Sequence, residues 1–305
     1  MDYVFTTRSL NQSTKKFTNN LATITRYIKL PTAGSSENKG RIVARDKWID
    51  EVLQQAENRE VLIYVHGFNN HQNDMIRRHR KIRNGLRVHG YKGAMVSFGW
   101  PSDFSGLQYP KGVRVSQKAA PKLVLDGIIP LLKARANLKV HILAHSMGSL
   151  VVRFGFAKTA NTKIAGRIWK IGKVLLVAAD VHSACVSNGN SKSKSLLTRC
   201  SQLTNYHSSV DSILWLSENT FWDNKPRLGY IGAPNSAFPN LVDINCRNRY
   251  VTNKNNYPNS FRRSHVWYFH DPRFYSDVAH VIKGSQASPV FPTRARNAAG
   301  EMFLR

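Results

Sequence analysis

The chain of 305 residues is predicted to form an α/β fold, in which helices cover a mostly parallel central sheet. Two observations support this prediction. Four continuous apolar segments of strand length occur at 61–65, 94–98, 140–144 and 174–178, and such segments are typical of parallel strands buried on both faces. Segments with helical spacing of apolar residues separate them, so the chain alternates between strand and helix as parallel sheets require.

The N-terminal region precedes these central strands and has a different pattern. It contains two strand-like segments, Tyr3–Thr7 and Ala22–Leu30. A connection at 32–40 follows, and its Gly, Ser and Asn residues predict a flexible loop. Near the other end of the chain, residues 240–245 read as a last strand.

Helices are predicted at 74–89, 112–136 and 147–160, between the central strands. The first of them has one apolar stripe, formed by residues at the positions i, i+4, i+7 and i+11. These residues are Met75, His79, Ile82 and Leu86. The second helix contains Pro121 and Pro130, which are expected to break it because proline has no amide hydrogen to donate.

All these elements are expected to form a single domain over residues 1–305. Polar or mixed segments near 181–201 and 217–240 are predicted to be loop insertions, and the stretch 187–195 is rich in Ser, Asn and Lys. Neither segment is long enough to be a convincing linker between domains.

Basic residues greatly outnumber acidic ones, with 45 Lys and Arg against 18 Asp and Glu, so the formal net charge is +27. A charge of this size favours an anionic partner, such as an anionic surface or a polyanion. The basic residues are spread along the chain, and no zinc-finger or RNA-recognition motif accompanies them. A specific nucleic acid is therefore not expected as a partner.

The cysteines and the N-terminus indicate the compartment. Cys185, Cys200 and Cys246 are too few to staple a chain of this length, and they lack the spacing of metal ligands. We expect buried free thiols, no bound metal and no cofactor. The N-terminus lacks a basic segment followed by an apolar one, and no apolar stretch approaches the ~20 residues of a membrane span. These features predict a cytoplasmic protein.

The most informative motif is Ala144-His145-Ser146-Met147-Gly148, which lies between a buried strand and a helical segment. This is the setting of a nucleophile elbow, a sharp turn that exposes a serine at the carboxyl end of a strand. The flanking residues must be small because the turn is tight, and Ala144 stands where a glycine is usual. Ser146 is therefore the candidate nucleophile.

A second turn, His66-Gly67-Phe68, follows the strand at 61–65. Glycine lets the backbone pass close to the serine. The N–H of Phe68 is therefore predicted to bind the oxyanion of the reaction, together with the N–H of Met147. Taken alone, the same residues would indicate an ordinary glycine turn.

A serine nucleophile needs a histidine base and an acid that orients the base, in the chain order Ser, Asp or Glu, His. Asp211, beyond the second strand after the nucleophile strand, is the preferred acid, and Asp180, beyond the first, is the alternative. His265 is the preferred base because it follows the predicted last strand, and His270 is the alternative. Asp211 could instead cap the helix that follows it.

Several segments resemble a bacterial α/β-hydrolase family long catalogued as a domain of unknown function. The resemblance rests on Val-Phe-Thr-Thr-Arg at 4–8, Val-Leu-Ile-Tyr-Val-His-Gly-Phe-Asn at 61–69 and His-Ser-Met-Gly at 145–148. Weaker similarity occurs at 210–217, 227–229 and 265–268. The resemblance implies the α/β-hydrolase fold, with Ser146 as nucleophile, Asp211 as acid and His265 as base.

These observations predict a serine hydrolase that cleaves a small-molecule or lipid carboxylic ester through an acyl-enzyme. One alternative is a lipase or phospholipase at an anionic membrane surface, which would use the same triad and dock through its basic surface. A second alternative is a non-enzymatic protein that binds a polyanion or nucleic acid on a hydrolase scaffold, favoured by the basic helical segment 77–87.

Six aromatic residues in segments near the expected mouth of the site could line an acyl or aryl pocket. They are Trp215, Phe221, Trp222, Tyr230, Phe238 and Trp267. Ordinary packing is the commoner role for any one of them.

Overall fold

The computed structural model describes residues 1–220, 224–284 and 291–305. An 11-stranded sheet runs through it, with the strand order β10-β11-β9-β8-β7-β6-β4-β5-β1-β2-β3. The strands are β1 (Asp2–Leu10), β2 (Phe17–Leu30), β3 (Arg41–Val43), β4 (Glu60–Val65), β5 (Ala94–Gly99), β6 (Lys139–His145), β7 (Ile171–Val177), β8 (Cys200–His207), β9 (Leu241–Asn245), β10 (Arg294–Arg296) and β11 (Met302–Leu304).

The centre of the sheet is parallel, as the continuous apolar segments predict. The four segments form β4, β5, β6 and β7, and each of these strands pairs in parallel with its neighbours. Antiparallel pairing occurs between β1 and β2, between β2 and β3, and between β10 and β11, towards the two edges. Because the central strands are parallel, their carboxyl ends meet at one edge of the sheet, where the following turns can converge.

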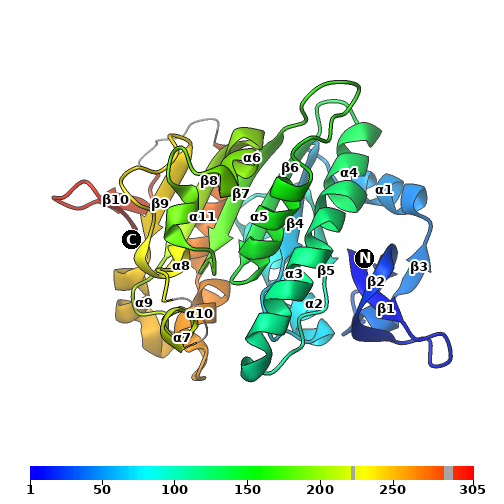
Figure 1. Cartoon of the computed structure of the whole chain (residues 1–305), viewed down its shortest axis with the longest axis horizontal. Coiled ribbons are helices and arrows are strands. Elements are labelled where there is room, and N and C mark those ends of the chain that lie inside the picture. The colour runs from blue at the N-terminus through cyan, green and yellow to red at the C-terminus, as the bar shows by residue number, and fades with distance from the viewer. Residues whose placement is uncertain (221–223, 285–290) are drawn as a thin grey trace.

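Helices lie on both faces of the sheet (Figure 1). They are α1 (Arg45–Gln54), α2 (Gln72–Val88), α3 (Tyr109–Lys122), α4 (Ile129–Ala134), α5 (Gly148–Lys158), α6 (Ser191–Arg199), α7 (Ser212–Thr220), α8 (Leu228–Ile231), α9 (Arg247–Asn253), α10 (Arg263–Val266) and α11 (Pro272–Lys283). Alternate side chains of β4 enter two separate cores. Ile63 packs in the core that contains Val151 of α5, and Leu62 in the core that contains Met75 of α2 and Val278 of α11.

The helical region that begins at Tyr109 continues through Pro121, so the prediction that this proline breaks it is wrong. Pro121 lies inside α3, a π-helical turn follows at Leu123–Ile128, and α4 begins at Ile129 with Pro130 in its first turn. Proline cannot donate to the carbonyl four residues earlier, which is that of Gln117, and Lys158 Nζ of α5 donates to this carbonyl at 2.9 Å instead.

The polar stretch 187–195 is also more ordered than predicted. Helix α6 begins at Ser191, where the side chain of Asn190 accepts a hydrogen bond from the Lys192 N–H at 2.9 Å. Leu196 and Leu197 then anchor the helix in the core. Ser and Asn are common both in loops and at helix caps, so the composition of this stretch cannot distinguish a loop from the start of a helix.

The three cysteines, Cys185, Cys200 and Cys246, are buried free thiols, as expected. Within the described ranges, no helix combines the length and the apolar character needed to cross a bilayer. These same ranges contain no group of three or more His, Cys, Asp or Glu side chains placed to hold a metal ion.

Candidate active site

Ser146 lies in a tight turn between the end of β6 at His145 and the start of α5 at Gly148. Its backbone has a φ of +54°, a left-handed conformation that costs a non-glycine residue about 1–2 kcal/mol. Hydrogen bonds hold the turn in this state. The Ser146 N–H donates to the Val177 carbonyl at 3.0 Å, and the Ser146 carbonyl accepts from the Ser149 N–H at 2.9 Å. This strained conformation is typical of a nucleophile elbow.

Two glycines make room for the turn. A Cβ atom on Gly148 would lie 2.5 Å from the Val65 carbonyl oxygen, and one on Gly67 would lie 2.8 Å from the Ser146 Cβ. Both positions therefore require glycine, because these distances are shorter than van der Waals contact. Ala144, by contrast, lies inside β6, where its methyl group packs in the core without displacing the strand.

His265 and Asp211 form a buried pair. The His265 Nδ1–H donates to Asp211 Oδ2 at 2.8 Å, and their side chains are 5% and 0% exposed. Because Nδ1 carries the proton, Nε2 presents a lone pair and can act as a base. His265 lies on α10, which follows β9, and Asp211 lies between β8 and α7. The strand at 240–245 is not the last one as predicted, because β10 and β11 follow it and β11 pairs in parallel with β9.

The two oxygens of Asp211 have separate partners. Oδ2 accepts from His265, whereas Oδ1 accepts from the backbone N–H groups of Ile213 at 3.1 Å and Leu214 at 3.0 Å. Asp211 therefore caps the start of α7 and orients a histidine at the same time. The two interpretations that the sequence left open for this residue describe different oxygens of one carboxylate.

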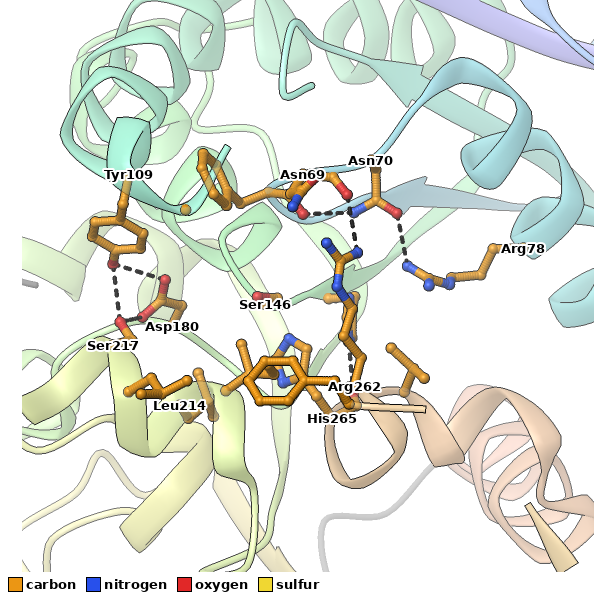
Figure 2. A pocket seen from close by; sticks show the side chains of 17 residues that line it. Asn69, Asn70, Arg78, Tyr109, Ser146, Asp180, Leu214, Ser217, Arg262 and His265 are labelled. Carbon is orange, nitrogen blue, oxygen red and sulfur yellow. Dashed lines mark hydrogen bonds between the residues drawn. The ribbon is translucent and has the colours of Figure 1, made fainter. Parts of the chain in front are cut away.

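Ser146 and His265 line one cavity of about 300 Å³ at the carboxyl edge of the sheet (Figure 2). Its walls include a set of apolar side chains from α7, the α10 region and the turn after β4. These are Phe68, Ile213, Leu214, Leu216, Phe261 and Val266. Most of the surface of the cavity is apolar, and polar side chains such as Ser146, His265 and Asp180 converge on it, which is usual for a site that binds a small molecule.

The predicted oxyanion donors lie in the two turns beside Ser146. Phe68 follows Gly67, and Met147 directly precedes α5, whose N-terminal end favours negative charge. In the described ranges, neither the Phe68 N–H nor the Met147 N–H donates to a backbone carbonyl. Asn70 fixes the first turn, because its side-chain Nδ2 donates to the carbonyls of Gly67 and Phe68 at 3.0 and 2.9 Å.

Asp180, the alternative acid, also lines this cavity but has other partners. Its carboxylate accepts hydrogen bonds from Tyr109 Oη at 2.8 Å and Ser217 Oγ at 2.7 Å, and Arg227 Nε lies 3.5 Å away. Burial raises the pKa of Asp180, while Arg227 opposes that change. Tyr109 and Ser217 thus occupy the oxygens that a histidine would need.

His270, the alternative base, contacts a different group. Its ring nitrogens lie 3.3 and 3.4 Å from Lys81 Nζ, in a separate cavity of about 110 Å³. Burial and then Lys81 lower the pKa of His270. Ser146 lines the larger cavity and His270 the smaller one, so the structure brings together Ser146 and His265 and leaves His270 outside.

Two histidines that sequence order excluded as bases support the site. The His145 Nε2–H donates to the His265 carbonyl at 3.0 Å, and the two rings lie 4.6 Å apart. Burial, and then His265, hold the pKa of His145 well below its ordinary value. His66 accepts from the Trp100 N–H at 3.2 Å, and burial lowers its pKa to about 3. Both therefore stay neutral at physiological pH and act by positioning the backbone.

The aromatic lining differs from the prediction. Aromatic side chains in the cavity come from Phe68, Tyr109 and Phe261. Of the six predicted candidates, Trp267 and Phe238 pack in the two cores, and Trp215 is 49% exposed. Tyr230 packs against a core as well. Phe221 and Trp222 lie outside the described residues. None of the four described candidates lines the cavity, and Trp267, Phe238 and Tyr230 have the ordinary packing role that was expected for any one of them. Proximity in the sequence does not determine which way a side chain points.

The basic segment on α2 is partly neutralised within the molecule. Arg80 Nε lies 2.7 Å from the buried carboxylate of Asp2, and Arg83 also pairs with it. Arg77 pairs with Asp74 at 2.6 Å. The segment is therefore not a continuous free basic face of the kind that a polyanion-binding helix would present.

A comparison of the sequence with models of known protein families identifies the family of this chain. The family model described as "Alpha/beta hydrolase of unknown function (DUF900)" matches residues 42–253. No curated protein matches the chain.

Solved structures give distant matches. An esterase from Pyrobaculum calidifontis is 13% identical with a TM-score of 0.40, over 76% of this chain and 77% of its own. A cutinase from Trichoderma reesei is 11% identical with a TM-score of 0.34, over 78% and 85%. Phospholipase PlaB from Legionella pneumophila is 17% identical with a TM-score of 0.33, over 54% and 39%.

Proposed function

Because the chain belongs to the DUF900 family of α/β hydrolases, we propose that it is a serine hydrolase that cleaves a carboxylic ester through an acyl-enzyme. One observation carries the proposal. A strained serine turn and a histidine that donates Nδ1–H to a buried aspartate line the same cavity. Together they supply a nucleophile, a base of the right tautomer and an orienting acid.

The proposed reaction starts when Ser146 Oγ attacks the ester carbonyl and His265 Nε2 takes the serine proton. Asp211 keeps the other imidazole proton on Nδ1 and stabilises the imidazolium. The N–H groups of Phe68 and Met147 bind the oxyanion of the tetrahedral intermediate. The C–O bond to the alcohol then breaks, and His265 gives its proton to the leaving alcohol. Water repeats these steps on the acyl-enzyme and releases the acid.

Labelling with a fluorophosphonate tests this assignment. The reagent should modify Ser146, and mass mapping should find the label on the peptide that contains it. Ser146→Ala protein should lose both the label and the hydrolysis of a p-nitrophenyl acyl ester while its circular dichroism stays native. A matched control is Ser13→Ala, which changes an exposed serine far along the chain. A label on another residue, or turnover that survives in Ser146→Ala, would refute the proposal.

A lipid ester is a second candidate substrate, because apolar side chains lie exposed beside the cavity. Phe261 lines the cavity and is 74% exposed, and Leu107, next to the lining residue Gly106, is 90% exposed. Exposed apolar residues beside a cavity opening, on a chain of net charge +27, suit contact with an anionic lipid surface. Sedimentation with phosphatidylglycerol vesicles should retain the protein, and Leu107→Ser with Phe261→Ser should weaken retention. Equal retention on neutral phosphatidylcholine vesicles would contradict the proposed attraction between the basic protein and an anionic lipid surface.

A further inference from the structure

Two arginines form one end of the proposed active-site cavity. Arg78 of α2 and Arg262, directly before α10, line it together with Ser146 and His265. In Figure 2 their side chains lie to one side of Ser146, and Tyr109, Asp180 and Ser217 lie to the other. The cavity therefore has a cationic end and a carboxylate end, with the serine between them.

Polar contacts hold both guanidinium groups in place but do not neutralise them. Arg262 Nη1 donates to the Asn69 carbonyl, and Arg78 Nη1 donates to Asn70 Oδ1, each at 3.1 Å. The Arg78 guanidinium also lies over the Phe269 ring, 4.8 Å from its centre. In the described ranges neither arginine has a carboxylate within ion-pair distance. Most of their N–H donors thus remain available, because a guanidinium carries five of them.

The surroundings add positive charge instead of balancing it. The smaller cavity shares Arg78 and Val266 with the larger one and is also lined by Arg77, Lys81 and His270. Its one carboxylate, Asp74, pairs with Arg77 at 2.6 Å. Burial and then Arg78 lower the pKa of Arg262, and Asp74 opposes them, so the repulsion between the two guanidinium charges is only partly offset. An anion between them would relieve this repulsion.

We propose that Arg78 and Arg262 bind a carboxylate or phosphate group of the substrate, so that the enzyme acts on esters that carry an anionic group. This inference rests on the proposed serine hydrolase function. A planar guanidinium fork matches the oxygen geometry of carboxylates and phosphates, and charged hydrogen bonds of this kind are among the strongest. At the opposite end Arg227 already pairs with Asp180 and is not offered to a second anionic group, so the uncharged part of the substrate lies towards Leu214 and Tyr109.

Matched esters test the inference. One pair is p-nitrophenyl pentanoate and the mono-p-nitrophenyl ester of glutaric acid, which have similar length but differ by a terminal carboxylate. A third ester with a terminal phosphonate separates the two anion types. The wild type should have a higher kcat/KM for at least one anionic ester than for the pentanoate. Arg262→Gln and Arg78→Gln should each lower the ratio of kcat/KM for the anionic ester to kcat/KM for the pentanoate about tenfold or more, whatever they do to both esters together.

Two control variants separate a local contact from the overall charge. Arg87→Gln removes one charge from an exposed position on the same helix, α2, and should change neither ester. Arg262→Lys keeps the charge but loses the fork, and should retain part of the preference. The inference is overturned if the wild type prefers the neutral ester, if both esters lose activity equally in the arginine variants, or if Arg87→Gln has the same effect.

Binding without turnover distinguishes failure of this inference from failure of the proposed function. Titration calorimetry of glutarate and of inorganic phosphate into Ser146→Ala protein should detect at least one of them, and Ser146→Ala with Arg262→Gln should lose that binding. Absence of binding in the first protein overturns the anion site. Absence of ester hydrolysis and of fluorophosphonate labelling in the wild type overturns the hydrolase function, and the calorimetry still reports on the anion site.

Discussion

The two separate roles of the Asp211 oxygens lead to a sharp prediction for Asp211→Asn. The amide oxygen of the new residue can still accept from Ile213 and Leu214, so the start of α7 keeps its cap. The amide NH₂ then faces His265 Nδ1 in place of the oxygen that now lies 2.8 Å away. The imidazole must present a lone pair there and carry its proton on Nε2, where it cannot accept the proton of Ser146.

The expected loss is large in turnover and small in stability. An aspartate-to-asparagine change in a serine triad lowers kcat by about 10⁴ through the wrong tautomer. The kcat of Asp211→Asn should therefore fall about 10⁴-fold. Its free energy of unfolding should decrease by less than the free energy of unfolding of Asp211→Ala decreases. Asp211→Ala removes the cap as well and should be destabilised by a further 1–2 kcal/mol or so, since cap removal costs about that much.

Initial rates on a p-nitrophenyl ester and urea unfolding of the same preparations measure the two effects. Asp180→Asn is the matched control for turnover, because Asp180 lines the same cavity but has Tyr109, Ser217 and Arg227 as its partners instead of a histidine. It should keep kcat within about tenfold of the wild type, as expected of a residue that does not set the tautomer. An Asp211→Asn protein with near-normal kcat would refute the assigned role, and equal destabilisation by Asn and Ala would refute the separation of the two oxygens.

Three further outcomes follow from the same structure. In Gly67→Ala the new Cβ would lie 2.8 Å from the Ser146 Cβ, so the variant should displace the serine and lower turnover by about 100-fold while its circular dichroism stays native. Unchanged rates would show that the turn can accommodate the methyl group. Asp277→Asn should cost about 3–5 kcal/mol in urea unfolding, because it leaves the charge of buried Arg294, now 2.6 Å from the carboxylate, without its partner; a loss below 1 kcal/mol would contradict this. Burial lowers the pKa of His66 to about 3, so the stability that its neutral form contributes is complete above its ordinary pKa of 6.5 and is lost as the pH falls towards 3. Between these values the wild type should lose about 1.4 kcal/mol per pH unit more than His66→Gln, and equal slopes in urea unfolding would show that His66 does not titrate there.

The predicted fold class is confirmed, and the reason is local. Apolar segments such as 61–65 and 140–144 are continuous because both faces of those strands are buried, and this leaves a direct trace in the sequence. The family that the motifs resemble is also confirmed, by the model that matches residues 42–253. The helix break at Pro121 was wrong because the Gln117 carbonyl, which loses its helical donor to the proline, accepts a hydrogen bond from Lys158 of α5, a contact that only the tertiary structure provides.

The candidate site was predictable to a different degree at each residue. Ser146 is marked by its strand, its small neighbours and the helix that follows, all within a few positions. The acid and base are separated from it by tens of residues, so chain order and the predicted positions of the strands reduced the candidates but left Asp180 and His270 open. The structure brings His265 and Asp211 to 2.8 Å and occupies Asp180 with Tyr109 and Ser217, yet the catalytic roles themselves stay predictions until they are measured.

Other residues around the cavity left no trace that sequence patterns could detect. His145 donates to the His265 carbonyl, a contact that joins the end of β6 to α10, and Asn70 holds the turn after β4 through its bond to the Phe68 carbonyl. Arg262 comes within the same cavity as Arg78 only because α10 returns to the carboxyl edge of the sheet. Nothing in the spacing of these side chains distinguishes them from ordinary surface residues.

The sequence by itself determined the alternation of buried strands and helices, the sharp turn at Ser146 and the excess of positive charge. These properties depend on residues near one another in the chain, whose apolar pattern and size directly restrict the local backbone. Only the tertiary structure decided which aspartate meets which histidine, which arginines pair with Asp2, and which arginines lie beside Ser146 with no carboxylate within ion-pair distance among the described residues. Such pairings depend on where the carboxyl ends of parallel strands converge, and that convergence is a property of the assembled sheet.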